Sequence, residues 1–101
     1  MKKVILSNHE NELELMFTTF EKYEDFDFLL EYLKQYQKAK VFDIVNDFDI
    51  RSAYARIESS TLRLYRDPYS TSLYGSFNDR LILQKIHDDV VQRLSQDYLK
   101  E

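Results

Sequence analysis

The sequence predicts an α+β domain in which about four helices cover a small sheet of three to four strands, with a long helix at the C-terminus. One observation is that apolar residues recur at helical spacing in four stretches of the chain. Another is that short runs of strand-forming residues separate these stretches. The chain has 101 residues, of which 44% are hydrophobic and none is cysteine, so we expect a single domain over residues 1–101 without disulfides. The alternative is an all-α bundle in which 41–57 form one continuous helix.

The first three expected elements are a strand and two helices. Lys2–Leu6 is a short apolar run that is typical of a strand. Ser7 and Glu10 have the spacing of a capping box, in which each side chain binds a free backbone N–H group at the start of a helix. Apolar residues at helical spacing follow, which predicts one helix over 8–22 and a second over 25–38. The first stripe consists of Leu13, Met16, Phe17 and Phe20, and the second of Phe26, Leu29, Leu30 and Leu33.

The remaining strands and two further helices are expected after residue 40. Val41–Val45 is typical of a buried strand. Asn46 can cap a third helix over 46–57, although 52–58 would also suit a strand. Thr61–Arg66 alternates apolar and polar residues, which predicts another strand. A ragged strand over Ser70–Ser76 and a helix beginning at Ser76 or Asn78 complete the order, and the apolar face of this helix consists of Ile82, Leu83, Ile86, Val90, Leu94 and Tyr98.

Charge is distributed unevenly along the chain. The formal net charge is −4, and residues 1–50 carry eleven acidic and six basic side chains, whereas residues 51–101 carry seven acidic and eight basic ones. All the arginines lie in the second half. We therefore expect the first half to form an acidic surface and the second half to form one that displays arginine.

The common catalytic and cofactor-binding motifs do not match this chain. With a single glycine, it has no glycine-rich loop that could hold a nucleotide phosphate. Asp43, Asp47 and Asp49 lack the alternating ligands and the glycine of a calcium-binding loop, so we interpret them as caps. His87 precedes Asp88, but successive helix residues project about 100° apart, so we predict that Asp88 cannot orient His87. We expect no catalytic residue, cofactor or metal site, and no enzymatic activity.

The stretch Tyr65–Phe77 is the first candidate for a binding surface. It contains the only proline and the only glycine of the chain together with several tyrosines, and arginines lie on both sides of it. Tyrosine and arginine are enriched among the residues that dominate protein interfaces. The second candidate is an acidic stripe along the predicted first helix. The residues expected to contact a partner are Arg63, Tyr65, Arg66, Tyr69, Tyr74 and Arg80 from the first candidate and Glu10, Glu14 and Glu21 from the second.

These features predict a small acidic protein that binds and blocks another protein. In size, acidity and lack of catalytic motifs, the chain is similar to small immunity proteins, antitoxins and phage anti-defence proteins such as anti-CRISPR inhibitors, although no motif places it in one of these families. The expected partner has a basic surface, as a nuclease or a nucleic-acid-binding protein does. No secretion signal or membrane-spanning apolar run is visible, so we expect a cytoplasmic protein with no membrane partner.

Two alternative functions stay open at this point. One is direct binding of nucleic acid by the arginines and tyrosines of segment 63–80, which the negative net charge disfavours. The other is a homo-oligomeric structural subunit, such as a homodimer. Phe28, Tyr32 and Tyr36 recur at i, i+4 and i+8 and would form an aromatic ridge along the second helix. That ridge either packs in the core or lies between copies of the chain.

Overall fold

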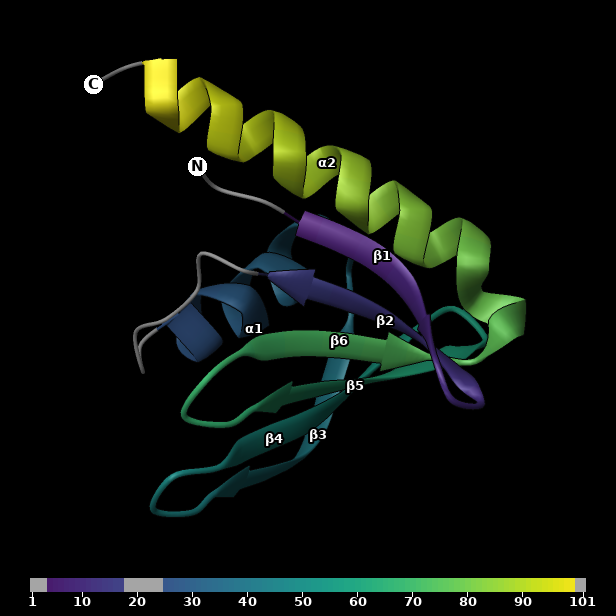
Figure 1. Cartoon of the computed structure of the whole chain (residues 1–101), viewed down its shortest axis with the longest axis vertical. Helices are drawn as coiled ribbons and strands as arrows, with labels where there is room; N and C mark the ends of the chain where they lie inside the picture. The colour runs from purple at the N-terminus through teal and green to yellow at the C-terminus, as the bar shows by residue number, and fades with distance from the viewer. Residues whose placement is uncertain (1–3, 18–24, 100–101) are drawn as a thin grey trace.

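The computed structural model describes residues 4–17 and 25–99 of the chain, with side chains described for 4–17 and 26–93. Two α-helices and a six-stranded sheet make up this part of the molecule (Figure 1). The strands are β1 (Val4–His9), β2 (Glu12–Phe17), β3 (Lys40–Asn46), β4 (Arg51–Ile57), β5 (Ser60–Arg66) and β6 (Thr71–Gly75), and the helices are α1 (Asp25–Tyr36), the short 3-10 helix η1 (Phe77–Asp79) and α2 (Arg80–Leu99).

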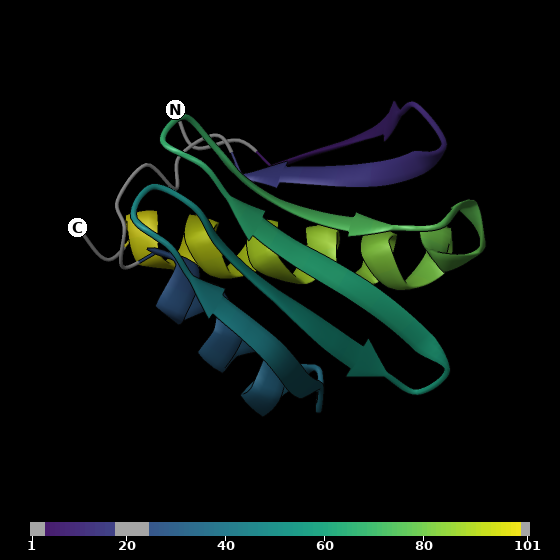
Figure 2. The ribbon, with the colours of Figure 1, turned by 90° about the horizontal axis from the view of Figure 1, so that it is seen from below.

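The sheet is antiparallel throughout, and its strand order is β1-β2-β6-β5-β4-β3. Both α-helices lie on the same side of it, with α2 against β1 and β2 and α1 against β3 (Figure 2). We call this side the covered face and the opposite side the open face, because no described helix lies on the latter. In the described part of the chain, neither α-helix has a stretch long and apolar enough to cross a membrane.

Burial alternates along the strands because successive side chains point to opposite faces. In β4, Ala53 and Ala55 are buried on the covered face, whereas Tyr54 and Arg56 are exposed on the open face. The same period of two places leucines inward in β2, β5 and β6. The main members of the resulting core are Leu13, Leu15, Phe17, Leu62, Leu64 and Leu73 from the sheet, and Phe26, Leu29, Leu33, Leu83, Ile86 and Val90 from the helices.

The predicted fold, with about four helices over three to four strands, is wrong, and so is the all-α alternative. The segment 8–17, expected to open the first helix, forms the end of β1, a turn and β2. Glu10 lies in that turn with a positive φ of 56°. Leu13, Leu15 and Phe17 also alternate with period two, and their burial against α2 and the other strands outweighs the helical pattern.

The third helix predicted over 46–57 is likewise absent. That segment forms the end of β3, a turn and β4, in which Arg51, Ala53, Ala55 and Ile57 are buried in strict alternation. The expectations for α1, α2 and the strands near Val41–Val45, Thr61–Arg66 and Ser70–Ser76 agree with the structure within a few residues. The error therefore lies in two segments where a hairpin strand also fitted a helical wheel.

The edge strand β3 contains a β-bulge. Phe42 pairs with Tyr54 and Val45 pairs with Ser52, so the register shifts between these pairs. Asp43 lies at the shift and has a φ of 52°, which is uncommon for a residue with a side chain. Such a bulge makes an exposed edge strand a poor template for pairing with another strand.

Arg51 fastens the β3–β4 hairpin to α1. Its Nε donates a hydrogen bond to Asn46 Oδ1 at 2.6 Å, and its Nη2 donates to Asp27 Oδ1 at 2.7 Å. The guanidinium also lies 4.4 Å from the centre of the Phe26 ring. The hydrogen bond and the charge of Arg51 lower the pKa of Asp27 below its ordinary value. The position of the hairpin relative to the helix is thus fixed by a buried arginine.

Candidate functional site

The open face carries a row of aromatic and charged side chains that crosses five of the six strands. The strand register places Phe42 opposite Tyr54, Tyr54 opposite Arg63, Arg63 opposite Tyr74, and Tyr74 opposite Glu14. Directly opposed side chains of an antiparallel pair are close enough to interact. We call these five residues the open-face row.

Ring contacts connect the members of this row. The Phe42 and Tyr54 rings are stacked, with centroids 5.6 Å apart and planes 19° apart. The Arg63 guanidinium lies 4.6 Å from the centre of the Tyr74 ring. Both Phe42 and Tyr54 are exposed to solvent. The β3–β4–β5 part of the open face therefore presents flat aromatic surface beside a guanidinium.

Glu14 holds the other end of the row in place. This carboxylate is only 8% exposed, and it accepts hydrogen bonds from Ser72 Oγ at 2.6 Å and from the Tyr74 hydroxyl at 3.1 Å. His9 Nδ1 lies 3.8 Å from the second carboxylate oxygen. Burial and the nearby Glu14 raise the pKa of Tyr74, so its phenol stays protonated and donates. Because Tyr74 donates a hydrogen bond to Glu14, the two side chains hold each other in place on the open face.

Arg63 is held from a second direction. Its Nη2 donates to Glu12 Oε1 at 3.2 Å, so a carboxylate and an aromatic ring both restrain the guanidinium. A side chain that is already ordered loses less conformational entropy when a partner binds. The open face is therefore a preorganised surface.

The structure brings together four of the residues that the sequence singled out for partner contact. Arg63, Tyr65, Tyr74 and Glu14 all lie on the open face, from three different strands. Glu14 was expected on a helix, yet its position in β2 places it beside Tyr74. This juxtaposition depends on the pairing of β2 with β6 and could not be read from spacing along the chain.

The other predicted contact residues that the structure describes lie apart from the open-face row. Arg66 is on the covered face, 6% exposed, and its Nη1 donates to Thr71 Oγ1 at 2.8 Å, so it is not available to a partner. Tyr69 is exposed in the β5–β6 turn, and Arg80 begins α2 with its Nη2 3.5 Å from Asn8 Oδ1. Glu10 lies in the β1–β2 turn, and Glu21 lies outside the described residues.

Sequence reasoning missed Tyr54 and Phe42. Tyr54 was assigned to the apolar face of a third helix, and Phe42 to a buried strand. The alternation of small or apolar residues with polar ones over 52–57 was the signal that could have placed Tyr54 on a solvent-facing strand surface. Phe42 lies on the same surface as Tyr54, because the two residues are paired directly in the sheet.

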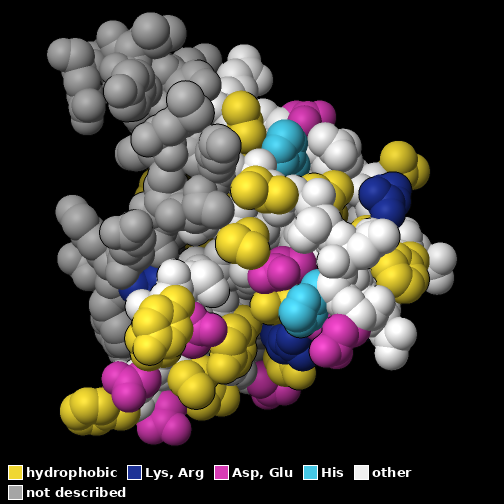
Figure 3. Space-filling model, viewed as in Figure 1, with side chains coloured by type: hydrophobic (Ala, Val, Ile, Leu, Met, Phe, Trp, Pro, Cys, Tyr) yellow, Lys and Arg dark blue, Asp and Glu magenta, His cyan; other side chains and the backbone are white. Residues whose placement is uncertain are grey.

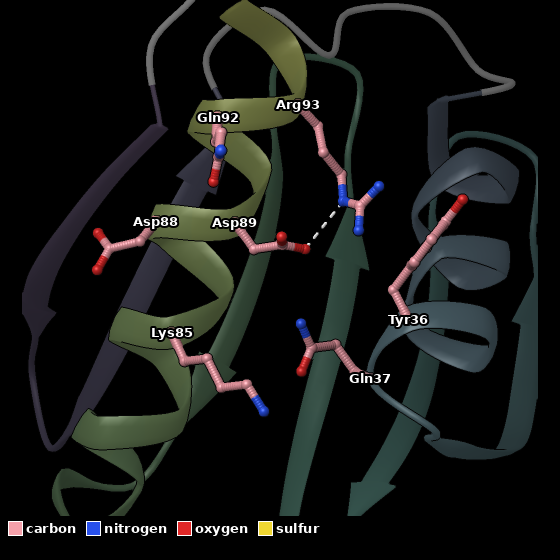
Figure 4. A pocket seen from close by; sticks show the side chains of 7 residues that line it. All are labelled: Tyr36, Gln37, Lys85, Asp88, Asp89, Gln92 and Arg93. Carbon is pink, nitrogen blue, oxygen red and sulfur yellow. Dashed lines mark hydrogen bonds and ion pairs between the residues drawn. The ribbon is translucent and has the colours of Figure 1, made fainter. Parts of the chain in front are cut away.

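A hollow of about 470 Å³ lies between the end of α1 and α2 (Figure 4). Beside it, the Tyr32 hydroxyl donates to Asp89 Oδ2 at 2.6 Å and accepts from Gln37 Nε2 at 2.8 Å. Arg93 Nε donates to the same Asp89 oxygen at 3.0 Å, and its guanidinium lies 3.7 Å from the centre of the Tyr36 ring. Hydrogen bonds among Tyr32, Gln37, Asp89 and Arg93 thus connect the two helices.

The charges beside this hollow follow from those contacts. Burial raises the pKa of Tyr32 well above its usual range, and the Asp89 carboxylate adds to the shift. Burial also raises the pKa of Asp89, but hydrogen bonds from Tyr32 and Arg93 outweigh it and lower the value overall. The predicted aromatic ridge is consequently divided, because Tyr32 is buried between the helices while Phe28 and Tyr36 are exposed.

The expectation that Asp88 cannot reach His87 is wrong. His87 Nδ1 lies 2.9 Å from Asp88 Oδ1, and His87 Nε2 lies 3.0 Å from the Val4 carbonyl oxygen. The projection angle ignored side-chain rotation, which lets neighbouring side chains on a helix fold toward each other. The hydrogen bond from His87 is the main cause that lowers the pKa of Asp88. The imidazole joins α2 to the backbone of β1, which is a structural role.

Comparison of the chain with known proteins found no family model that matches it, no similar curated protein and no similar solved structure. The function proposed below is therefore inferred from the residues of this chain alone.

Proposed function

We propose that this protein is a non-enzymatic binding protein that uses the open face of its sheet to cover and block a surface of another protein. The observation that carries the proposal is the open-face row, in which aromatic rings and Arg63 lie side by side on a sheet surface that no described helix covers. Immunity proteins, antitoxins and anti-defence inhibitors are the classes of protein that act in this way.

The chemistry of the row favours a protein partner. Tyrosine and arginine supply large contact area together with hydrogen-bonding ends, and they dominate the binding energy of many protein interfaces. The row stands on a six-stranded sheet, and its polar ends are already bound to Glu12, Glu14 and Ser72. Binding then requires little ordering of the surface, which favours affinity.

The net charge of −4 supports a partner with a basic surface, such as a nuclease or another nucleic-acid-binding protein. Opposite charges on two proteins speed their association and suppress binding to acidic competitors. We propose a cytoplasmic location, with which a chain that has no cysteine is compatible.

Site-specific photo-crosslinking tests the proposal. A photo-reactive phenylalanine analogue at Tyr54 is expected to crosslink one protein in a lysate of the native organism, whereas the same analogue at Leu81, an exposed apolar position on α2, is not. The captured protein is then purified and titrated calorimetrically with wild type and with a Tyr54→Ser, Arg63→Gln double variant. We expect the double variant to bind at least about 30-fold more weakly while its circular dichroism is unchanged. Equal affinities of wild type and variant would contradict the proposal.

A second candidate is single-stranded nucleic acid. The exposed Phe42–Tyr54 stack lies near Arg56 and Lys40 on the same face, and bases can stack on aromatic rings while basic side chains contact phosphates. Glu12 and the negative net charge oppose this function. If the protein does not retard single-stranded oligonucleotides in a gel at low salt, this second candidate is removed.

A third candidate is a homo-oligomeric subunit. Phe28 and Tyr36 are exposed on α1, so this helix could contribute to a contact between copies even though Tyr32 is buried. Light scattering over a wide range of concentrations decides the matter. A mass that stays at that of one chain, 12.2 kDa, removes this candidate.

A further inference from the structure

The β3–β4 and β5–β6 turns have the same construction and lie side by side. In the first, the Asp47 N–H donates to the Ile50 carbonyl oxygen at 2.8 Å. In the second, the Asp67 N–H donates to the Ser70 carbonyl oxygen at 3.0 Å. The strands that follow and precede them pair directly, since Arg51 in β4 is opposite Arg66 in β5. The two turns therefore project from one end of the sheet, as Figure 1 shows. We call them the paired turns.

Each turn exposes one aromatic side chain almost completely. Phe48 is 93% exposed and Tyr69 is 90% exposed, the largest exposures among the apolar and aromatic residues described. Both are held at the backbone by an aspartate, because the Phe48 N–H donates to Asp47 Oδ1 and the Tyr69 N–H donates to Asp67 Oδ1, each at 2.8 Å. Burial of such a ring by a partner would be favourable, because apolar surface would be removed from water.

Buried arginines fix the bases of the paired turns. Arg51 binds Asn46 just before the first turn and Asp27 on α1, and Arg66 binds Thr71 just after the second turn. Both guanidiniums lie on the covered face. The base of the first turn is thus anchored to α1, and the base of the second turn is anchored to the start of β6.

Acidic residues are sequence neighbours of both exposed rings. Asp47 and Asp49 flank Phe48 in the sequence, and Asp67 begins the turn that carries Tyr69. Figure 3 shows hydrophobic and acidic side chains intermingled at the lower corner of the molecule, where Figure 1 places the β3–β4 turn. An apolar anchor close to negative charge matches an apolar recess that is bordered by positive charge.

We infer that the paired turns dock on a protein surface that has an apolar recess bordered by lysine or arginine, with Phe48 and Tyr69 as the anchors. The inference rests on the proposed protein-binding function and adds the chemistry of the partner. A second copy of the chain fits poorly, because it would bring the aspartates of two copies together. The bulge at Asp43 also disrupts the β3 edge that two copies would pair through.

A phage-displayed library of random short peptides is the probe that tests this inference. Panning on the immobilised full chain is expected to enrich peptides in which lysine or arginine neighbours tryptophan, leucine or phenylalanine. The enriched peptides are synthesised, and their affinities are measured by fluorescence polarisation at low and high salt. Because exposed charges are screened within about 10 Å at 0.1 M salt, we expect affinity to fall as salt rises.

Three variants locate the binding site of the peptides. Phe48→Ser with Tyr69→Ser removes both anchors and is expected to weaken binding at least about tenfold. Asp47→Asn with Asp49→Asn is expected to weaken binding and to reduce its dependence on salt. The control is Leu81→Ser on α2, which is 87% exposed and should leave binding unchanged. The replaced rings are exposed, so the fold is retained.

Several results would overturn the inference. These are a failure to enrich any peptide, enrichment of peptides without basic residues, and affinities that the anchor variant leaves unchanged. Dimerisation of the wild type that the anchor variant abolishes would assign the turns to a second copy instead. Peptides that lose affinity only for the Tyr54→Ser, Arg63→Gln variant would refute the role of the turns, but they would support binding by the open face. The two proposals can therefore fail separately.

Discussion

Leu73 and Tyr74 are neighbours in β6, and they represent the two faces of the sheet. Leu73 is fully buried on the covered face, where it pairs with Leu15 on one side and Leu64 on the other. Tyr74 is half-buried on the open face, where it contacts Glu14 and Arg63. One residue thus contributes apolar burial to the fold, and the next contributes an ordered polar and aromatic surface. If the open face binds a partner as proposed, stability and recognition are divided between alternate residues of the same strands.

The arginines follow the same division. Arg51 and Arg66 lie on the covered face, where Arg51 joins its hairpin to Asp27 of α1 and Arg66 binds Thr71 within its own hairpin. Arg63 lies on the open face, where it holds a tyrosine ring in a surface that faces solvent. The role of each arginine therefore depends on which face of the sheet its position in the strand points to.

The largest expected effect comes from removing the Leu73 side chain. Leu73→Ala deletes apolar volume between β2, β5 and the helices, and such a cavity should lower the free energy of unfolding by about 2–5 kcal/mol. Urea unfolding followed by circular dichroism measures it. A loss below about 1 kcal/mol would mean that the covered face does not supply the main core.

Gly75 provides the next largest effect, at the end of the same strand. A Cβ atom added at this position would lie 2.9 Å from Leu62 Cδ2 and 3.1 Å from Leu83 Cδ1, so neighbouring side chains must move. We expect Gly75→Ala to destabilise the fold by about 1–3 kcal/mol through overpacking. Combining it with Leu62→Val, which removes the closest methyl group, should recover part of this loss in the same unfolding assay. No recovery would contradict the steric explanation.

The sequence predicted elements with a single periodicity and failed where two periodicities coincided. The stripe Phe26, Leu29, Leu30 and Leu33 has no alternation of period two, and it forms the predicted helix. Leu13, Leu15 and Phe17 satisfy a strand while Leu13 and Phe17 also satisfy a helix, and only burial within the sheet decides between them.

The site was predictable in composition and not in arrangement. Arginine and tyrosine were predicted to be binding residues, yet the placement of Tyr54, Arg63 and Tyr74 in one row depends on pairing between strands. Arg66 could have been set apart, because it continues the alternation of Leu62 and Leu64 and must point to the same face. Contacts between residues far apart in the sequence carry no such local signal.

Tyr74→Phe sharpens the comparison with Leu73 by changing only the open face. The substitution removes the hydroxyl that donates to Glu14 at 3.1 Å and keeps the ring beneath Arg63. Glu14 retains its bond from Ser72, so we expect a loss of about 1 kcal/mol in the same unfolding assay. A loss equal to that of Leu73→Ala would show that the open face supports the fold as strongly as the covered face does.

Acidification gives the smallest expected effect and should act on the helix side of the molecule. Hydrogen bonds from Arg51 lower the pKa of Asp27, and those from Tyr32 and Arg93 lower the pKa of Asp89 against the effect of burial. A carboxyl whose pKa is lower in the folded state than in the unfolded chain stabilises the fold above the unfolded value. That stability is lost as the pH falls through the folded pKa.

The unfolding free energy should therefore decrease as the pH falls below the ordinary aspartate value of 3.8. Asp89→Asn should make this decrease smaller, since its own contribution is gone at every pH. Identical pH profiles for wild type and variant would show that the contact between α1 and α2 does not depend on the charge of Asp89.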